Sequence, residues 1–155
     1  MKITAQEEYG LRCLLQLAKA PRDQLMSVKE IAEKEGLSSA YVEKLLRLLA
    51  KSGLVHSMRG LRGGYILNRP SASITLGEVM RALGTMPNTD QICHQFTGKE
   101  AQCVHFTNCG IRSVWSGLTT YMQNFMDHTI ISSLLDNEFE VSARMSKRFN
   151  TTRER

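Results

Sequence analysis

The fold of this chain is decided by residues 27–53, which read SVKEIAEKEGLSSAYVEKLLRLLAKSG. Ser27 and Glu30 form a capping box, in which the serine oxygen accepts from the amide three residues on and the glutamate reaches back, so a short helix starts here. Gly36 is suited to the left-handed conformation that ends a helix. The serines that follow can start a second helix at once, with apolar residues at helical spacing. Two short helices joined by so tight a turn predict a helix-turn-helix.

The residues after this stretch change to strand spacing. We expect strands over 54–58 and 65–68, joined by residues 59–64, which read Arg-Gly-Leu-Arg-Gly-Gly. Glycine gives this tip its backbone freedom and arginine gives it charge. A helix-turn-helix followed by a hairpin with a basic tip predicts a winged helix.

Further capping boxes place helices on both sides of this unit. Thr4 with Glu7 predicts a helix of about 16 residues, which Pro21 stops. Thr75 with Glu78 predicts a shorter helix after the hairpin. The winged unit is therefore expected to be flanked by helices at both ends.

The C-terminal half combines a long loop with a long helix. Residues 86–108 show no periodic pattern, and a loop of that length inside a compact domain usually has a function. An apolar stripe then predicts a helix of about 19 residues. The stripe consists of Ile111, Val114, Leu118, Tyr121 and Phe125. It either packs on its own domain or forms a dimer seam, and its mean step of about 3.5 residues favours the seam. Thr129 is expected to cap a last short helix.

Composition indicates one compact domain with a local excess of positive charge. The 155 residues are 42% hydrophobic and 23% charged, with a formal net charge of +5. No apolar run of about 18 residues and no leader-like start are present, so we expect neither a membrane span nor export, and a cytoplasmic protein. Between Lys44 and Gly77 the chain has basic residues and no acidic one. The basic residues are Lys44, Arg47, Lys51, Arg59, Arg62 and Arg69. A solvated surface would explain such a run, but its place over the second helix and the hairpin favours a polyanion partner.

Double-stranded DNA is the polyanion that this fold would read. The start of the second helix would enter the major groove, and the arginines of the hairpin tip would enter the minor groove. The expected contact residues are Ser38, Ser39, Tyr41, Glu43 and Lys44 on the helix, with Arg59 and Arg62 on the wing. Tyr41 has an alternative role in packing against the first helices. A homodimer would place two reading heads about 34 Å apart, so the operator should be a near-palindrome.

Three of the four cysteines lie in the long loop. Cys93, Cys103 and Cys109 have the spacing C-x9-C-x5-C, and a reducing compartment makes a disulfide framework improbable. Iron–sulfur clusters suit such loose spacings. Zinc, with His94 or His105 adding nitrogen, and simple thiol sensing remain open. Cys13 is expected to be a small core residue.

Residues along most of the chain resemble one known family. These are Met1 to Thr4 with Glu8 to Leu11, the segment 36–46 (GLSSAYVEKLL), Gly53 to Val55, Arg59-Gly60, Gly63 to Tyr65 and Ile74 to Leu76. In this order they resemble the Rrf-two family of winged-helix transcriptional regulators, which includes IscR-, NsrR-, RirA- and RsrR-like members. The likeness covers roughly residues 1–135. It implies a homodimer whose operator affinity is controlled by an iron–sulfur cluster, responding to redox state, nitric oxide or iron status.

The resemblance also implies a ligand set. Cys93, Cys103 and Cys109 match the three cluster cysteines, although most members have five or seven residues between the first two, which leaves [2Fe-2S] and [4Fe-4S] both open. Arg112 stands where IscR-like members have a ligating histidine, and a guanidinium cannot ligate. NsrR- and RsrR-like members instead use a carboxylate of the first helix, where this chain has Glu8. Glu43 matches a position that tunes sequence preference in IscR-like members.

The expected architecture is mainly α-helical with a small β-hairpin wing. We expect a winged helix-turn-helix DNA-binding domain over 1–84, a cluster-binding loop over 85–109, a dimerisation helix with a short packing helix over 110–136, and a basic, flexible tail over 137–155. The rivals are a cluster-free, thiol- or partner-responsive repressor of CymR-like type and a zinc-stabilised DNA-binding protein. No motif for catalysis is present, so an enzyme is not expected.

Overall fold

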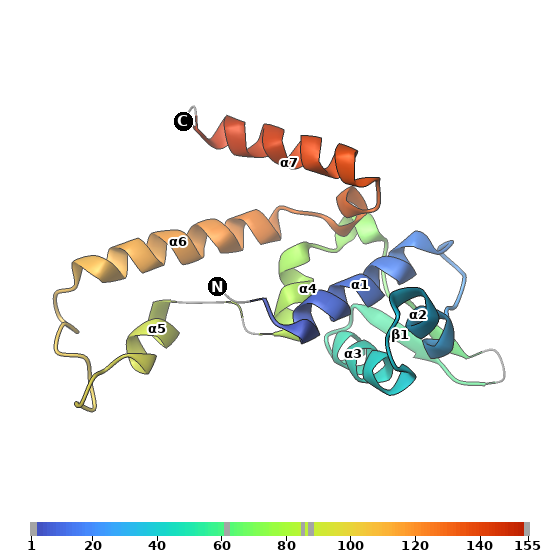
Figure 1. Cartoon of the computed structure of the whole chain (residues 1–155), viewed down its shortest axis with the longest axis horizontal. Coiled ribbons are helices and arrows are strands. Elements are labelled where there is room, and N and C mark those ends of the chain that lie inside the picture. The colour runs from blue at the N-terminus through green and yellow to red at the C-terminus, as the bar shows by residue number, and fades with distance from the viewer. Residues whose placement is uncertain (1–2, 61–62, 85, 87–88, 154–155) are drawn as a thin grey trace.

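The winged unit expected from the sequence is present, and two longer helices extend from it (Figure 1). The computed structural model describes residues 3–60, 63–84, 86 and 89–153. The elements in chain order are α1 (Ala5–Lys19), α2 (Val28–Glu35), α3 (Ser39–Lys51), β1 (Val55–Met58), β2 (Gly64–Leu67), the 3-10 helix η1 (Ser71–Ser73), α4 (Leu76–Leu83), α5 (Thr89–Gln95), α6 (Gly110–Asp127), the 3-10 helix η2 (Ile131–Leu134) and α7 (Glu138–Arg153).

The helix-turn-helix forms from α2 and α3 for the local reasons that the sequence indicates. Ser27 and Glu30 cap α2 reciprocally, and Gly36 ends it with a φ of 66° in the left-handed region. Ser38 then caps α3 by accepting a hydrogen bond from the Tyr41 amide at 3.3 Å. All three predicted capping boxes are confirmed, including those that open α1 and α4.

The wing is a two-stranded antiparallel hairpin tied to the rest of the unit through β2. Val55 pairs with Leu67 and Met58 with Gly64. Tyr65 also exchanges both backbone hydrogen bonds with Met26, at 2.8 and 3.0 Å, which adds a third extended segment. Gly64 is required at this crossing, because a Cβ there would lie 2.6 Å from the Met26 carbonyl oxygen. The wing is therefore anchored through Tyr65, next to the Met58–Gly64 pair that ends the ladder.

One apolar core holds the winged unit together. The fully buried side chains come from all of its helices, from the start of β1 and from η2. They include Leu14, Ile31, Val42, Leu45, Leu46, Leu49, Leu54, Ile74, Val79, Leu83 and Ile131. Cys13 is also 0% exposed, and burial raises the pKa of its thiol to about 11, so the prediction of a core cysteine is confirmed. Because α3 buries its apolar face in this core, its polar face is left toward solvent.

The helix α6 leaves the winged unit as an arm, with α5 beneath its far end (Figure 1). The C-terminal end of α6 packs on the unit, around the buried Met126 and an ion pair between Arg81 and Asp127 at 2.7 Å. No helix within the described residues is both long and apolar enough to cross a membrane.

Three predictions of secondary structure differ from what is found. The long loop contains a helix, α5, and the segment expected as a flexible tail forms α7. Thr129 does not cap a helix: its hydroxyl donates to the Phe125 carbonyl at 2.7 Å, and the following residues form the short η2. The start of α7 is capped by Asn137, whose side-chain oxygen accepts from the Glu140 amide at 3.0 Å.

Candidate DNA interface and cysteine site

The first turn of α3 presents the residues predicted to read DNA. Ser38, Ser39 and Lys44 are exposed. The Ser38 hydroxyl is used for capping, which leaves the Ser39 hydroxyl and the Lys44 ammonium for phosphates or base edges.

Tyr41 packs against α1, which is the alternative role considered for it, and also contacts Lys44. Its ring is half-buried and lies edge-on to Tyr9 of α1, with the ring centroids 6.2 Å apart. The Lys44 Nζ lies 5.9 Å from the Tyr41 centroid, within the range of a cation–π interaction. The packing interpretation is thus correct for one side of the ring, and the same ring orients a basic group of the recognition helix.

A groove of about 590 Å³ separates α3 from the wing. Its walls carry Arg47 and Lys51 from α3, with Ser57, Arg59 and Tyr65 from the hairpin. Arg59 was predicted, whereas the other four residues were not named as contacts. Arg47 and Lys51 stand one and two turns after Glu43, so the helical period that orients α3 toward the core also places them along this groove. Lys51 and Arg59 suit a phosphate backbone, whereas Arg47 shares this groove with Glu43.

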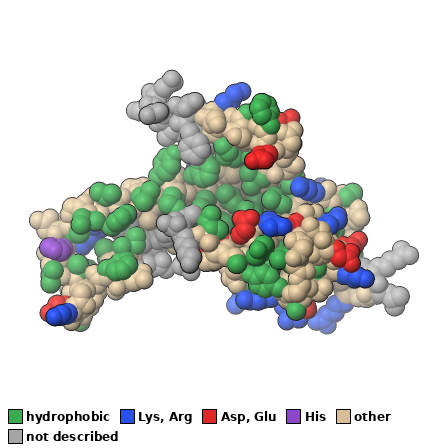
Figure 2. Space-filling view, in the orientation of Figure 1, with side chains coloured by type: hydrophobic (Ala, Val, Ile, Leu, Met, Phe, Trp, Pro, Cys, Tyr) green, Lys and Arg blue, Asp and Glu red, His purple; other side chains and the backbone are tan. Residues whose placement is uncertain are grey.

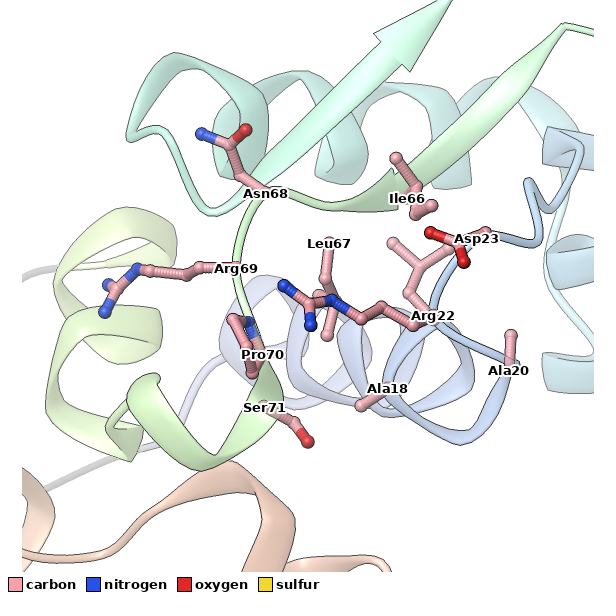
Figure 3. Close-up of a pocket in the computed structure, with 11 residues that line it drawn as sticks. Ala18, Ala20, Arg22, Asp23, Ile66, Leu67, Asn68, Arg69, Pro70 and Ser71 are labelled. Atoms are coloured by element: carbon pink, nitrogen blue, oxygen red, sulfur yellow. The ribbon is translucent and has the colours of Figure 1, made fainter.

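Two members of the acid-free run are neutralised by acids just outside it. Arg47 pairs with Glu43 at 2.6 Å, so the Glu43 carboxylate is not free. Arg69 pairs with Glu78 at 2.5 Å. Figure 3 shows why Arg69 does not add to the DNA-facing charge: its side chain turns away from a cavity of about 310 Å³ behind the wing and toward α4. Arg62 lies outside the described residues.

Positive charge nevertheless gathers on the side of α3 and the wing. In Figure 2 the Lys and Arg side chains crowd the lower edge of the winged unit, whereas the α5–α6 arm is mostly apolar. The local excess of positive charge expected from the sequence is therefore concentrated on one side of the structure (Figure 2).

The three loop cysteines lie on three different pieces of chain. Cys93 belongs to α5, Cys103 lies in a turn, and Cys109 is the N-cap of α6. All three are half-buried free thiols. Cys93 and Cys103 line one cavity of about 280 Å³, together with His94, Phe106 and Arg112.

Two of these cysteines share a cavity, but the three do not form a ready-made metal site. Among the described residues, no group of three or more His, Cys, Asp or Glu stands close enough to hold a metal ion. The donor types fit a thiophilic metal or an iron–sulfur cluster, because three thiols belong to one stretch of chain and none is used in a disulfide. A metal site often closes only when the metal pulls its ligands together.

Glu8 lies in the first turn of α1 with its side chain exposed. Four residues later Arg12 has a structural role: its Nε donates to the Glu35 carboxylate at 2.5 Å, and its guanidinium lies 5.3 Å from the Tyr9 centroid. The Glu35 hydrogen bond, with a smaller contribution from Glu8, raises the pKa of Arg12. Arg12 thus links α1 to α2 rather than serving as a ligand.

Comparison with known proteins identifies the family of this chain. The model of the Rrf2 family, described as an iron-dependent transcriptional regulator, matches residues 3–137. The protein rrf2 of Nitratidesulfovibrio vulgaris is 32% identical over 135 residues, which is 87% of each protein.

Two solved structures share the fold. The IscR of T. potens has 30% sequence identity and a TM-score of 0.68, with 87% of this chain and 86% of that chain covered. CymR, the global cysteine regulator of B. subtilis, has 29% identity and a TM-score of 0.70, with 87% and 96% covered. The family model, the winged fold and the basic groove agree: this chain belongs to the Rrf2 family of winged-helix, DNA-binding transcriptional regulators, which are not enzymes.

Proposed function

We propose that this regulator is a homodimer that binds a near-palindromic operator with an affinity controlled by an iron–sulfur cluster. The observation that carries the proposal is the cysteine loop: three free, half-buried thiols, two of which share a cavity, in a family described as iron-dependent. Cys93, Cys103 and Cys109 would hold the group. When bound, it would supply reversible redox chemistry and reactivity toward small oxidants.

Glu8 is the fourth ligand in this proposal, supplied by the partner subunit. Within the described residues, no side chain hydrogen-bonds or pairs with the Glu8 carboxylate at ion-pair distance, so it is available to a partner. A carboxylate oxygen is harder than a thiolate and a poorer match to a sulfur-rich iron site. The iron that Glu8 holds would therefore exchange most readily.

The start of α1 connects Glu8 to the DNA-reading helix. Tyr9, the next residue, contacts Tyr41 of α3, and Tyr41 in turn orients Lys44. Release of Glu8 would free this first turn of α1 and let the ring contact shift. Operator affinity would change because the recognition helix rests on that contact.

The dimer in this proposal forms along α6. Five large apolar side chains on α6 are between 40% and 64% exposed in the single chain. They are Ile111, Val114, Trp115, Leu118 and Tyr121. A second copy of the chain packed along this face would remove them from water and bring each Glu8 toward the other chain's loop.

The decisive experiment compares anaerobically purified wild type with Cys103→Ala. We expect coloured wild-type protein with iron and sulfide, and a variant that has lost the colour together with most of the iron. Cys13→Ala is the matched control, because Cys13 lies in the core and should leave the colour unchanged. Colourless wild type with stoichiometric zinc would overturn the cluster proposal.

A cluster-free regulator of CymR-like type is the second candidate. It is favoured by the TM-score of 0.70 to CymR and by the absence of a ready-made ligand group among the described residues. In that case the wild type would contain neither iron nor zinc, and operator affinity would follow oxidation of the loop thiols. Metal analysis of the same preparations separates this candidate from the cluster and from structural zinc.

A further inference from the structure

Arg112 ties together two parts of the cysteine loop. The chain from Cys103 to Phe106 makes a turn closed by a hydrogen bond from the Phe106 amide to the Cys103 carbonyl at 2.9 Å. The Arg112 Nη2 donates to the carbonyl oxygens of Phe106 at 2.5 Å and His105 at 3.3 Å. Arg112 stands in the first turn of α6, three residues after Cys109. Its guanidinium therefore fixes the Cys103 turn to the helix end that carries Cys109.

The same guanidinium supplies a positive charge to the cavity wall. Arg112 lines the cavity shared by Cys93 and Cys103, and its Cζ lies 5.6 Å from the Phe106 ring centroid. Among the described residues, no carboxylate forms an ion pair with it. A permanent, uncompensated cation on the wall attracts a negatively charged occupant and repels a bare cation. A cluster held by three thiolates and a carboxylate is negatively charged.

We infer that Arg112 is a positioning residue of the cysteine site, which clamps the Cys103 turn to the start of α6 and offers its charge to an anionic occupant. Arg112 stands at the position where the resemblance would place a ligating histidine. It does not ligate, but it hydrogen-bonds two backbone carbonyls and contributes a positive charge to the cavity. The clamp depends on the chain alone, whereas the charge role rests on the proposed cluster function. The two parts are tested separately.

The clamp is tested by hydrogen exchange on the full chain without metal. In Arg112→Ala we expect the amides of residues 103–109 to exchange about tenfold faster, because the charge-assisted hydrogen bonds to the Phe106 and His105 carbonyls are lost. Arg112→Lys should restore only part of the protection, because lysine lacks the planar guanidinium that lies over the Phe106 ring and its ammonium reaches less far than Nη2. Arg144→Ala is the matched control, since Arg144 also donates to a carbonyl, that of Ser133, in another part of the molecule. Unchanged exchange in Arg112→Ala, with α-helical content intact by circular dichroism, would overturn the clamp.

The charge role is tested on protein reconstituted anaerobically with iron and sulfide. We expect Arg112→Ala to lose iron to a chelator about tenfold faster than wild type, Arg112→Lys to lie between them, and Arg144→Ala to match wild type. Equal loss rates for wild type and Arg112→Ala would overturn this role. If wild type takes up no iron and sulfide at all, the cluster proposal and the charge role fail together, and hydrogen exchange still decides the clamp.

Discussion

Glu7 and Glu8 are neighbours in the sequence, but the fold uses them in opposite ways. Glu7 is 8% exposed and accepts hydrogen bonds from the Thr4 amide and hydroxyl, both at 2.8 Å. Gly84 packs so closely that a Cβ there would lie 2.1 Å from a Glu7 oxygen. Glu7 is thus fully committed to the cap of α1. Glu8 is exposed, and this difference is the reason why Glu8 and not Glu7 is proposed as the fourth ligand.

Replacing Glu8 tests this assignment at the scale of one residue. Glu8→Gln keeps the size of the side chain and removes its charge, so it should cost only about 0.5 kcal/mol of folding free energy through the helix dipole. We expect the variant to take up iron and sulfide through its cysteines and to lose them to a chelator several-fold faster than wild type, because a neutral amide is a weaker ligand.

The control for Glu8→Gln is Glu33→Gln. Glu33 is an exposed glutamate of α2 whose contact with Lys29, at 3.9 Å, is too weak to matter. It should behave as wild type in the chelator assay. If Glu8→Gln also retains its iron as wild type does, another group completes the site.

At the scale of elements, helices with strong local signals were predictable and those without them were not. The capping boxes of α1, α2 and α4 fix their own start through side chains three residues apart, so no tertiary contact is needed to see them. The helix α7 has no regular apolar stripe. Its position depends on Arg144, which reaches back to the Ser133 carbonyl and to Asp136 at 2.7 and 2.5 Å. The apolar periodicity of the sequence gives no sign of contacts between residues 8 or 11 positions apart.

The same distinction applies to the candidate site. The loop cysteines and the start of α3 could be named from residue type and spacing. The neutralisation of Arg69 could not be predicted from the sequence, because its partner Glu78 lies in another element. The clamp formed by Arg112 was also missed, because the sequence shows only that an arginine cannot ligate, and not which carbonyls it reaches.

The wing provides the prediction that belongs to this scale. Arg59 is exposed on the wall of the groove between α3 and the hairpin. We expect Arg59→Ala to weaken binding to all DNA sequences and to reduce the slope of log affinity against log salt by about one. Fluorescence anisotropy over a salt series measures both, with Arg144→Ala as a control of equal charge change. An unchanged slope and affinity would show that Arg59 of the wing does not contact DNA.

At the scale of the whole molecule, the cysteine loop and the basic surface lie in different places. The basic surface follows α3 and the wing, and the cysteine loop lies at the far end of the arm formed by α5 and α6 (Figures 1 and 2). Between them lies the apolar face of α6, whose large side chains stay exposed in the single chain. Exposed apolar patches of this kind mark interaction surfaces. A dimer along α6 would place one chain's cysteine loop near the winged unit of the other. It would thereby shorten the path from sensor to DNA.

Leu118→Asp tests this arrangement, because a carboxylate at the centre of the apolar face must lose its hydration when two copies meet. We expect wild type to sediment as a dimer and Leu118→Asp as a monomer. Binding to a palindromic operator should weaken about a hundredfold, since the two half-sites are no longer read together. Thr120→Asp places the same charge on an exposed position two residues on, about 200° around the helix, and should remain dimeric. A Leu118→Asp protein that still sediments as a dimer would mean that another surface joins the chains, and Glu8 would then have to reach the cysteine loop from a different direction.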